Sequence, residues 1–201
     1  SNSLVYIEVP AAHAFRKRVN EPFGQFSIEH VNFFSERSLA NLMGLYGFSN
    51  LYIRTEENEK NIYPPHPVIT SVWKNTNVYR ETQQDTALAK QIATYIRLSE
   101  KQKKRIDGKI NALGKSQVPI ILWGAGVHTL RLIANTKFGE LNIKSIVDSN
   151  SNLWGKSING LTVKSPSTIK TVSNAILVSS YTYQAEIVNF IRQNISSYKR
   201  I

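Results

Sequence analysis

Residues 118–148 combine the residue types that can hold a phosphate and a ribose. An apolar run that ends at Trp123 leads into the turn Gly124-Ala125-Gly126, and a helical pattern follows from Val127. A second β-rich run ends in Asp148, 22 residues after Gly126. Glycines let the backbone approach a phosphate, a helix N-terminus supplies unpaired N–H groups, and an acid at this spacing can bind ribose hydroxyls. The pattern predicts a nucleotide or nucleotide-sugar site; the alternative is that the glycines only make a tight turn.

The turn departs from the dinucleotide fingerprint at its third glycine position, which Thr129 occupies. That glycine normally permits close packing of the helix against the strand. The departure argues against an NAD-dependent enzyme, which stays the weakest of the functional alternatives.

Three apolar runs, residues 118–123, 143–147 and 175–179, predict parallel strands joined by crossover helices. Ligands of such sheets bind at the carboxyl ends of the strands, which gives the candidate binding residues Gly124, Ala125, Gly126, Val127, Asp148, Asn150, Lys156, Ser180 and Tyr181. At this edge Lys156 could reach a phosphate and Trp154 could stack on a base. The alternatives are a solvated lysine, a tryptophan packed under its loop, and an Asp148 that only caps the turn after its strand.

Composition restricts the partners. The net charge of +11 favours anionic ligands, but the basic run Lys101–Lys109 lies on a predicted helix without interleaved aromatic residues, so we do not expect nucleic-acid binding. Cysteine is absent and the four histidines are scattered, so no metal site is expected. No run is long enough to cross a membrane and no secretory signal is present, which predicts a cytoplasmic protein. Oligomeric state has no signal in the sequence.

The first part of the chain predicts strands at residues 4–9, 51–54 and 68–73, the last two as an antiparallel pair. Ser35 is a suitable N-cap for a helix whose apolar face is Leu39, Leu42, Met43 and Tyr46, and Gly47 suits its end. From about Asp85 to Leu113 a helical pattern runs without proline, with a break expected near Gly108. Ser165-Pro166 and residues 184–193 predict two further helices.

Two segments resemble a known family. The segment Phe23–Ser35 contains Glu29-His30 and Phe33-Phe34-Ser35, and a helix follows that ends in Gly47-Phe48; this resembles the late part of class I S-adenosylmethionine-dependent methyltransferases. Asp148-Ser149-Asn150, Gly155-Lys156, Gly160, Val163 and Ser165-Pro166 resemble the C-terminal domain of sugar C-methyltransferases. The resemblance implies an α/β fold: a partial methyltransferase domain with an antiparallel end (residues 1–80), a helical linker (81–116) and a small parallel Rossmann-like domain (117–201).

The resemblance also implies a reaction centre. It carries the catalytic glutamate and histidine over to Glu29 and His30, whereas the family's tyrosine is Ser27 here, a far poorer base. From the residues alone, a Glu-His pair in a loop can act as general acid or base, or can brace the loop by hydrogen bonds. The family's S-adenosylmethionine loop has no counterpart in this chain.

We therefore expect the C-terminal part of a longer methyltransferase, in keeping with a chain that starts at Ser1-Asn2 without methionine. The intact protein would use S-adenosylmethionine on a small-molecule acceptor, possible acceptors including a nucleotide-sugar. This fragment alone would bind no cofactor and be inactive. The alternative is a module that binds a nucleotide or nucleotide-sugar without catalysis.

Overall fold

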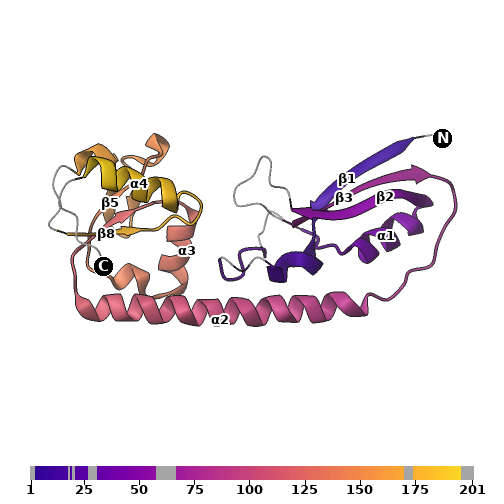
Figure 1. The fold of residues 1–201 in the computed structure, drawn as a ribbon, viewed down its shortest axis with the longest axis horizontal. Coiled ribbons are helices and arrows are strands. Elements are labelled where there is room, and N and C mark those ends of the chain that lie inside the picture. The colour runs from indigo at the N-terminus through magenta and orange to yellow at the C-terminus, as the bar shows by residue number, and fades with distance from the viewer. Residues whose placement is uncertain are drawn as a thin grey trace. The chain divides into compact units, whose positions relative to one another are not determined.

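The computed structural model describes residues 3–17, 19, 21–26, 31–57, 67–169 and 174–195 (Figure 1). Residue contacts divide the chain into two compact units, Ser1–Lys103 and Lys104–Ile201, here called unit 1 and unit 2. The division falls inside one long helix, α2 (Thr86–Ser116). One sheet is antiparallel and the other is mixed, so the expected α/β class is confirmed.

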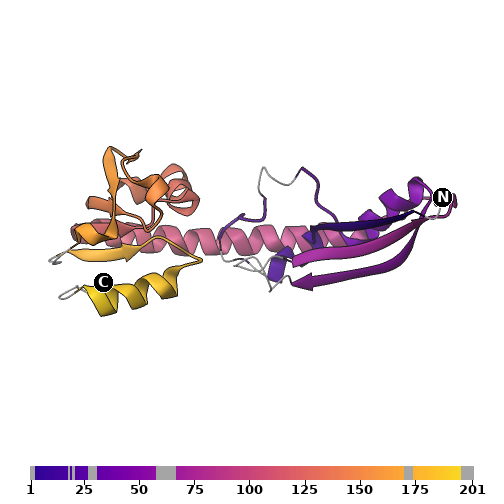
Figure 2. The same ribbon diagram turned by 90° about the horizontal axis from the view of Figure 1, so that it is seen from above.

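Unit 1 contains a three-stranded antiparallel sheet of β1 (Leu4–Pro10), β2 (Phe48–Glu57) and β3 (Pro67–Asn75), in the order β1-β3-β2 (Figure 2). The expected antiparallel pair is therefore present, with strands longer than the sequence indicated. Alternate residues of β3, among them Ile69 and Trp73, are buried on one face. These pack with residues of β1 and of helix α1 (Glu36–Leu45).

Ser35 caps α1 as expected: its hydroxyl accepts the Ser38 N–H at 3.0 Å, and the Ser38 hydroxyl accepts the Ser35 N–H in return. Gly47 has the positive φ, +74°, that favours glycine after a helix. The expected apolar face was too wide, because Leu42 and Tyr46 are exposed and only Leu39 and Met43 are buried. Helix α1 therefore packs on the sheet through Leu39 and Met43, which are four residues apart and lie on one face of the helix.

Helix α2 is continuous, and the break expected near Gly108 is wrong. Gly108 is exposed and a Cβ there would meet no atom within 4 Å, so the helix tolerates it. Asp85 caps the helix by accepting the Ala87 and Leu88 N–H groups. Residues Leu88, Ile92 and Tyr95 pack in unit 1, and Ile106, Ile110 and Leu113 pack in unit 2.

Unit 2 contains a five-stranded sheet in the order β6-β7-β5-β4-β8. The strands are β4 (Ile120–Trp123), β5 (Ile143–Val147), β6 (Ser157–Ile158), β7 (Leu161–Lys164) and β8 (Ala175–Val178). The three expected strands, β4, β5 and β8, pair in parallel, and β7 also joins β5 in parallel. The apolar runs of the sequence did not indicate β7.

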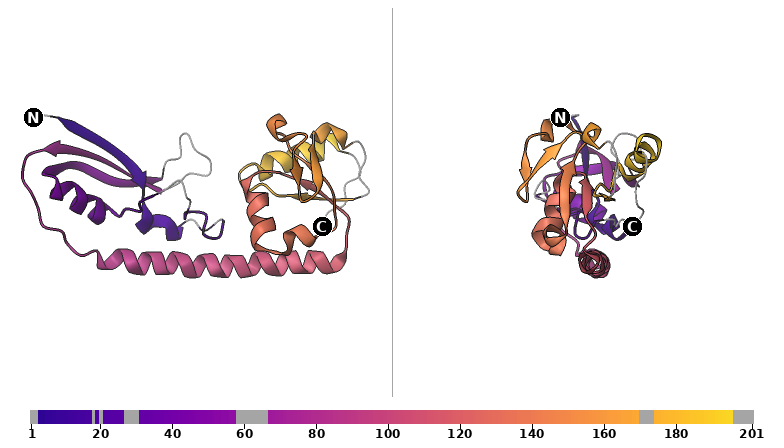
Figure 3. Two further views of the ribbon diagram at one scale, coloured as in Figure 1. Left: turned by 180° about the vertical axis from the view of Figure 1, so that it is seen from behind. Right: turned by 90° about the vertical axis from the view of Figure 1, so that its left-hand side faces the viewer.

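Two helices of unit 2 lie on opposite faces of this sheet (Figure 3). Ile120 and Leu122 of β4 pack with residues of α3 (Val127–Asn135) and of α2. Ile121 and Trp123 point the other way and pack with α4 (Gln184–Asn194). The remaining helical segments are short 3-10 turns: η1 (Ala12–Lys17), η2 (Lys137–Glu140), η3 (Ser151–Leu153) and η4 (Pro166–Thr168). Ser165 caps the last of these, where a short helix was expected.

Candidate functional site

The strand order places a topological switch point at β4. From β4 the chain moves to β5 and β7 on one side, and then crosses to β8 on the other side. At such a point the connections leave the sheet in opposite directions, and ligands of open parallel sheets bind in the crevice that results. The loops that follow β4 and β8 are the expected Gly124–Gly126 turn and residues Ser179–Tyr183.

Gly124 is required by the fold. Its φ is +117°, and a Cβ there would lie 2.5 Å from the Ser179 carbonyl oxygen. The Gly124 N–H also donates to the Val147 carbonyl at 2.9 Å. This glycine therefore permits close approach of the two loops that flank the switch point.

Thr129 explains why the third glycine of the fingerprint is absent. Its side chain is fully buried, and its hydroxyl donates to the Gly124 carbonyl at 2.7 Å. The same hydroxyl is hydrogen-bonded to Ser179 Oγ at 2.8 Å. Thr129 thus ties the Gly124 turn to the loop after β8, using the space that a glycine would leave empty.

Gly126 has no such structural requirement. It is the N-cap residue of α3 with φ −81°, and a Cβ there would meet no atom within 4 Å. No side chain caps this helix, and the neighbouring Val127 is 63% exposed. The start of α3 is therefore open, and the N–H groups of a first helical turn have no partners within their helix.

Asp148 braces the carboxyl end of β5. Its carboxylate accepts the Ala125 N–H at 2.6 Å and the Asn150 N–H at 2.7 Å. The alternative that Asp148 caps the turn after its strand is thus supported. Both carboxylate oxygens keep further lone pairs, so ribose binding stays a prediction.

The other candidate residues line the same edge of the sheet. Asn150 caps η3 through its side chain, and Ser180 Oγ accepts the Tyr183 N–H at 3.2 Å. Tyr181 is exposed. Lys156 is exposed, and its backbone pairs with Leu153 and Val163 on the β7 side of Asp148. Phosphate binding by Lys156 stays a prediction.

Glu29 and His30 lie outside the described residues, as does Ser27. The described residues on either side, Phe26 and Phe33, have rings in edge-to-face contact with centroids 5.7 Å apart. Both rings also contact Phe15, and Phe26 contacts Tyr95. An aromatic cluster of unit 1 therefore holds these flanking residues together.

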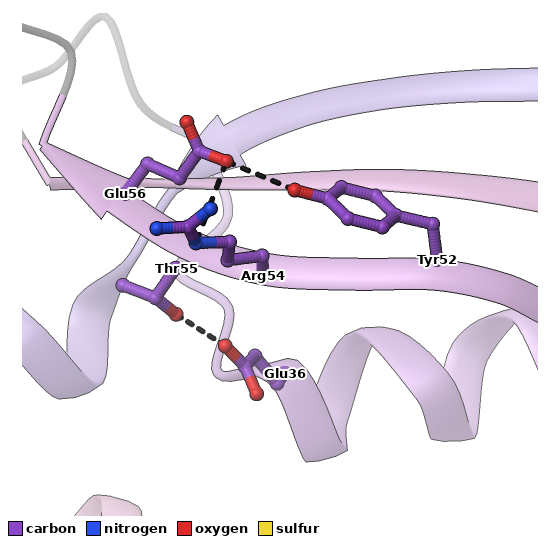
Figure 4. A network of polar contacts seen from close by, with 5 residues as sticks. All are labelled: Glu36, Tyr52, Arg54, Thr55 and Glu56. Carbon is purple, nitrogen blue, oxygen red and sulfur yellow. Dashed lines mark hydrogen bonds and ion pairs between the residues drawn. The ribbon is translucent and has the colours of Figure 1, made fainter.

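A polar chain in unit 1 was not expected from the sequence. Thr55 donates to Glu36 (Figure 4), and the Thr55 hydroxyl lies 2.9 Å from His13 Nε2. Because Thr55 donates to the carboxylate, His13 Nε2 carries the proton of this contact. Among the described residues His13 Nδ1 is buried and has no hydrogen-bond partner. A second set of polar contacts lies on β2 (Figure 4). The Glu56 carboxylate accepts the Tyr52 hydroxyl at 3.0 Å, and its Oε1 lies 3.7 Å from Arg54 Nε.

We predict that unit 1 loses stability in mild acid because of His13. Burial lowers the pKa of His13, outweighing the nearby Glu36 and Asp85 carboxylates, which raise it. The folded state then binds fewer protons than the unfolded state, so the contribution is full above pH 6.5 and is lost as the pH falls through the folded pKa. Urea unfolding of wild type and His13→Gln between pH 8 and pH 5 checks this. A difference between the two that does not change with pH would contradict it.

Among the described residues no cluster of histidine, cysteine, aspartate and glutamate could hold a metal ion. None of the helices in the described ranges has the length and apolar character needed to span a membrane.

Comparison with family models matches residues 116–201 to the family described as C2185-like, N-terminal. The match covers less than half of the chain: it starts at the last residue of α2 and includes the whole five-stranded sheet. Unit 2 is therefore similar to the N-terminal part of C2185-like proteins. No curated protein matches the chain.

Proposed function

We propose that unit 2 binds a nucleotide or nucleotide-sugar at the carboxyl ends of β4, β5 and β8. The observation that supports this most strongly is the contrast between the two glycines of the turn. Gly124 is needed for the fold. At Gly126, by contrast, both the backbone φ and the space around the residue would allow a side chain. A glycine that leaves open space at an uncapped helix start lets an anionic group approach the backbone.

The position of this opening supports the same ligand class. It lies at the switch point, where open parallel sheets bind their ligands. Asp148, which can meet ribose hydroxyls, is hydrogen-bonded to Ala125 next to it. The net charge of +11 adds long-range attraction for a phosphate-bearing molecule.

Gly126→Ser separates the binding role from the fold. Serine is a favoured N-cap, so we expect the variant to unfold at no lower urea concentration than wild type. Its side chain would occupy the open space and bond the first-turn N–H groups, so we expect affinity for nucleoside diphosphates to fall about tenfold. Calorimetric titration with ADP, GDP, UDP and CDP measures this.

Gly108→Ser is the matched control. It makes the same substitution at an exposed position where a Cβ also meets nothing within 4 Å, and it should bind as wild type does. Wild-type affinity in a folded Gly126→Ser variant would refute the proposed phosphate position.

We further propose that the chain belongs to an S-adenosylmethionine-dependent methyltransferase, with unit 2 holding its acceptor. The order of elements in unit 1 supports this proposal. Helix α1 ends before Gly47-Phe48, Phe48 begins β2, and β2 pairs antiparallel with β3. This is the terminal arrangement that the methyltransferase resemblance implies. In this proposal Glu29 and His30 are the general acid–base pair of the reaction. The alternative is a binding module without catalysis.

The described residues do not fit S-adenosylmethionine itself. The described strands of unit 1 pair only antiparallel, so a glycine turn between parallel strands is absent among them. We therefore expect no saturable heat when this chain is titrated with S-adenosylmethionine. Saturable binding would contradict the assignment of the cofactor to other parts of a longer protein.

A further inference from the structure

Trp154 is the exposed tryptophan of this chain. Its side chain is 44% exposed, whereas Trp73 and Trp123 are 1% and 2% exposed. The Trp154 indole N–H donates to the Asp148 carbonyl at 2.7 Å. One edge of the indole is therefore fixed at the carboxyl end of β5, while much of the ring remains accessible.

Hydrogen bonds of Asp148 connect the glycine turn to Trp154. Its carboxylate accepts the Ala125 N–H of the turn, and its carbonyl accepts the Trp154 indole N–H. The order is an open helix start, a carboxylate, and an aromatic ring. A nucleotide has the matching order of phosphate, ribose and base.

We propose that Trp154 is the stacking platform for a nucleobase, and that the ligand of unit 2 is a nucleoside phosphate and not a sugar phosphate without a base. The proposal rests on the proposed function and adds the orientation of the ligand. Every nucleobase has a π-face that can stack on an indole. A tryptophan that only packed beneath its loop would be buried, as Trp73 and Trp123 are.

Two lysines at this edge of the sheet add long-range attraction for a phosphate-bearing ligand. Lys156 lies two residues after Trp154. Lys164 is the last residue of β7, and the Lys164 carbonyl accepts the Asp148 N–H at 3.1 Å. Both lysines are exposed. They supply positive charge at this edge of the sheet.

Acrylamide quenching of tryptophan fluorescence tests the platform directly. Because Trp73 and Trp123 are buried, quenching of the whole chain reports mainly Trp154. We expect saturating AMP, GMP, UMP or CMP to lower the quenching constant, and ribose 5-phosphate, which lacks a base, to leave it unchanged. Equal protection by ribose 5-phosphate would overturn the proposal.

Two variants separate this proposal from the proposed function. Trp154→Ala should weaken nucleotide binding about tenfold and leave ribose 5-phosphate binding unchanged; Trp154→Phe keeps a ring and should retain most of the affinity, even if the alanine variant folds poorly. The stacking role of Trp154 is contradicted if nucleotides bind while Trp154 stays accessible to acrylamide, or if Trp154→Ala weakens the binding of both ligands equally. Either result leaves the proposed nucleotide site in unit 2 intact. If neither ligand class binds the wild type, both proposals fail.

Discussion

Gly124→Ala is expected to destabilise unit 2 by roughly 3–5 kcal/mol, the largest effect of any single substitution in the candidate site. Two causes add: a side chain is strained at φ +117°, and the new Cβ would lie 2.5 Å from the Ser179 carbonyl oxygen. That atom is backbone, so relief requires the two loops at the switch point to separate. Urea unfolding followed by circular dichroism measures the loss.

Gly126→Ala is the matched control for this prediction. It lies two residues away, and its Cβ would meet no atom within 4 Å. Its cost should be limited to a poorer N-cap residue, about 1 kcal/mol or less. Equal destabilisation by the two substitutions would show that Gly124 is not held against Ser179.

Asp148→Ala is expected to cost about 2–3 kcal/mol and to abolish measurable nucleotide binding. The substitution removes the acceptor of the Ala125 and Asn150 N–H groups, which lie on different loops. Losing the first bond frees the glycine turn from the end of β5, and the ribose would lose its expected acceptor. Calorimetry and urea unfolding on the same sample report the two effects.

Asp148→Asn separates the role of Asp148 as a hydrogen-bond acceptor from the role of its negative charge. The amide keeps one acceptor oxygen, so one of the two N–H bonds survives and about half of the stability loss should be recovered. An alanine variant as stable as wild type would contradict the bracing role of Asp148.

The sequence predicted the parallel strands of unit 2 because β4, β5 and β8 are short runs rich in apolar residues and bounded by turn residues, and β4 is buried throughout. It did not predict the place of β7 in the sheet. Leu161–Lys164 alternates apolar and polar residues over only four positions, whereas β8 is four apolar residues in succession. Asn159 and Gly160, both at positive φ, form the hairpin turn before it, and this Asn-Gly pair is the signal that could have located the strand.

The roles of the site residues were less predictable, because they depend on contacts between distant residues. The glycine turn was found from its spacing, but the need for Gly124 arises from Ser179, and the buried Thr129 hydroxyl also bonds Ser179. The spacing of Asp148 indicated a ribose acid, whereas the structure shows its bond to Ala125. Glu29 and His30 came from the family resemblance, and their roles stay predictions.

The central claim is that a nucleotide binds at the carboxyl edge of the unit 2 sheet. The most direct measurement is a titration of the isotope-labelled chain with a nucleoside diphosphate, followed by ¹⁵N–¹H correlation spectra. We predict that the largest shifts occur at the Gly126 and Val127 amides, at the start of α3, and at the Trp154 indole N–H, which donates to Asp148. Saturable shifts confined to other residues, or no shifts at all, would contradict the claim.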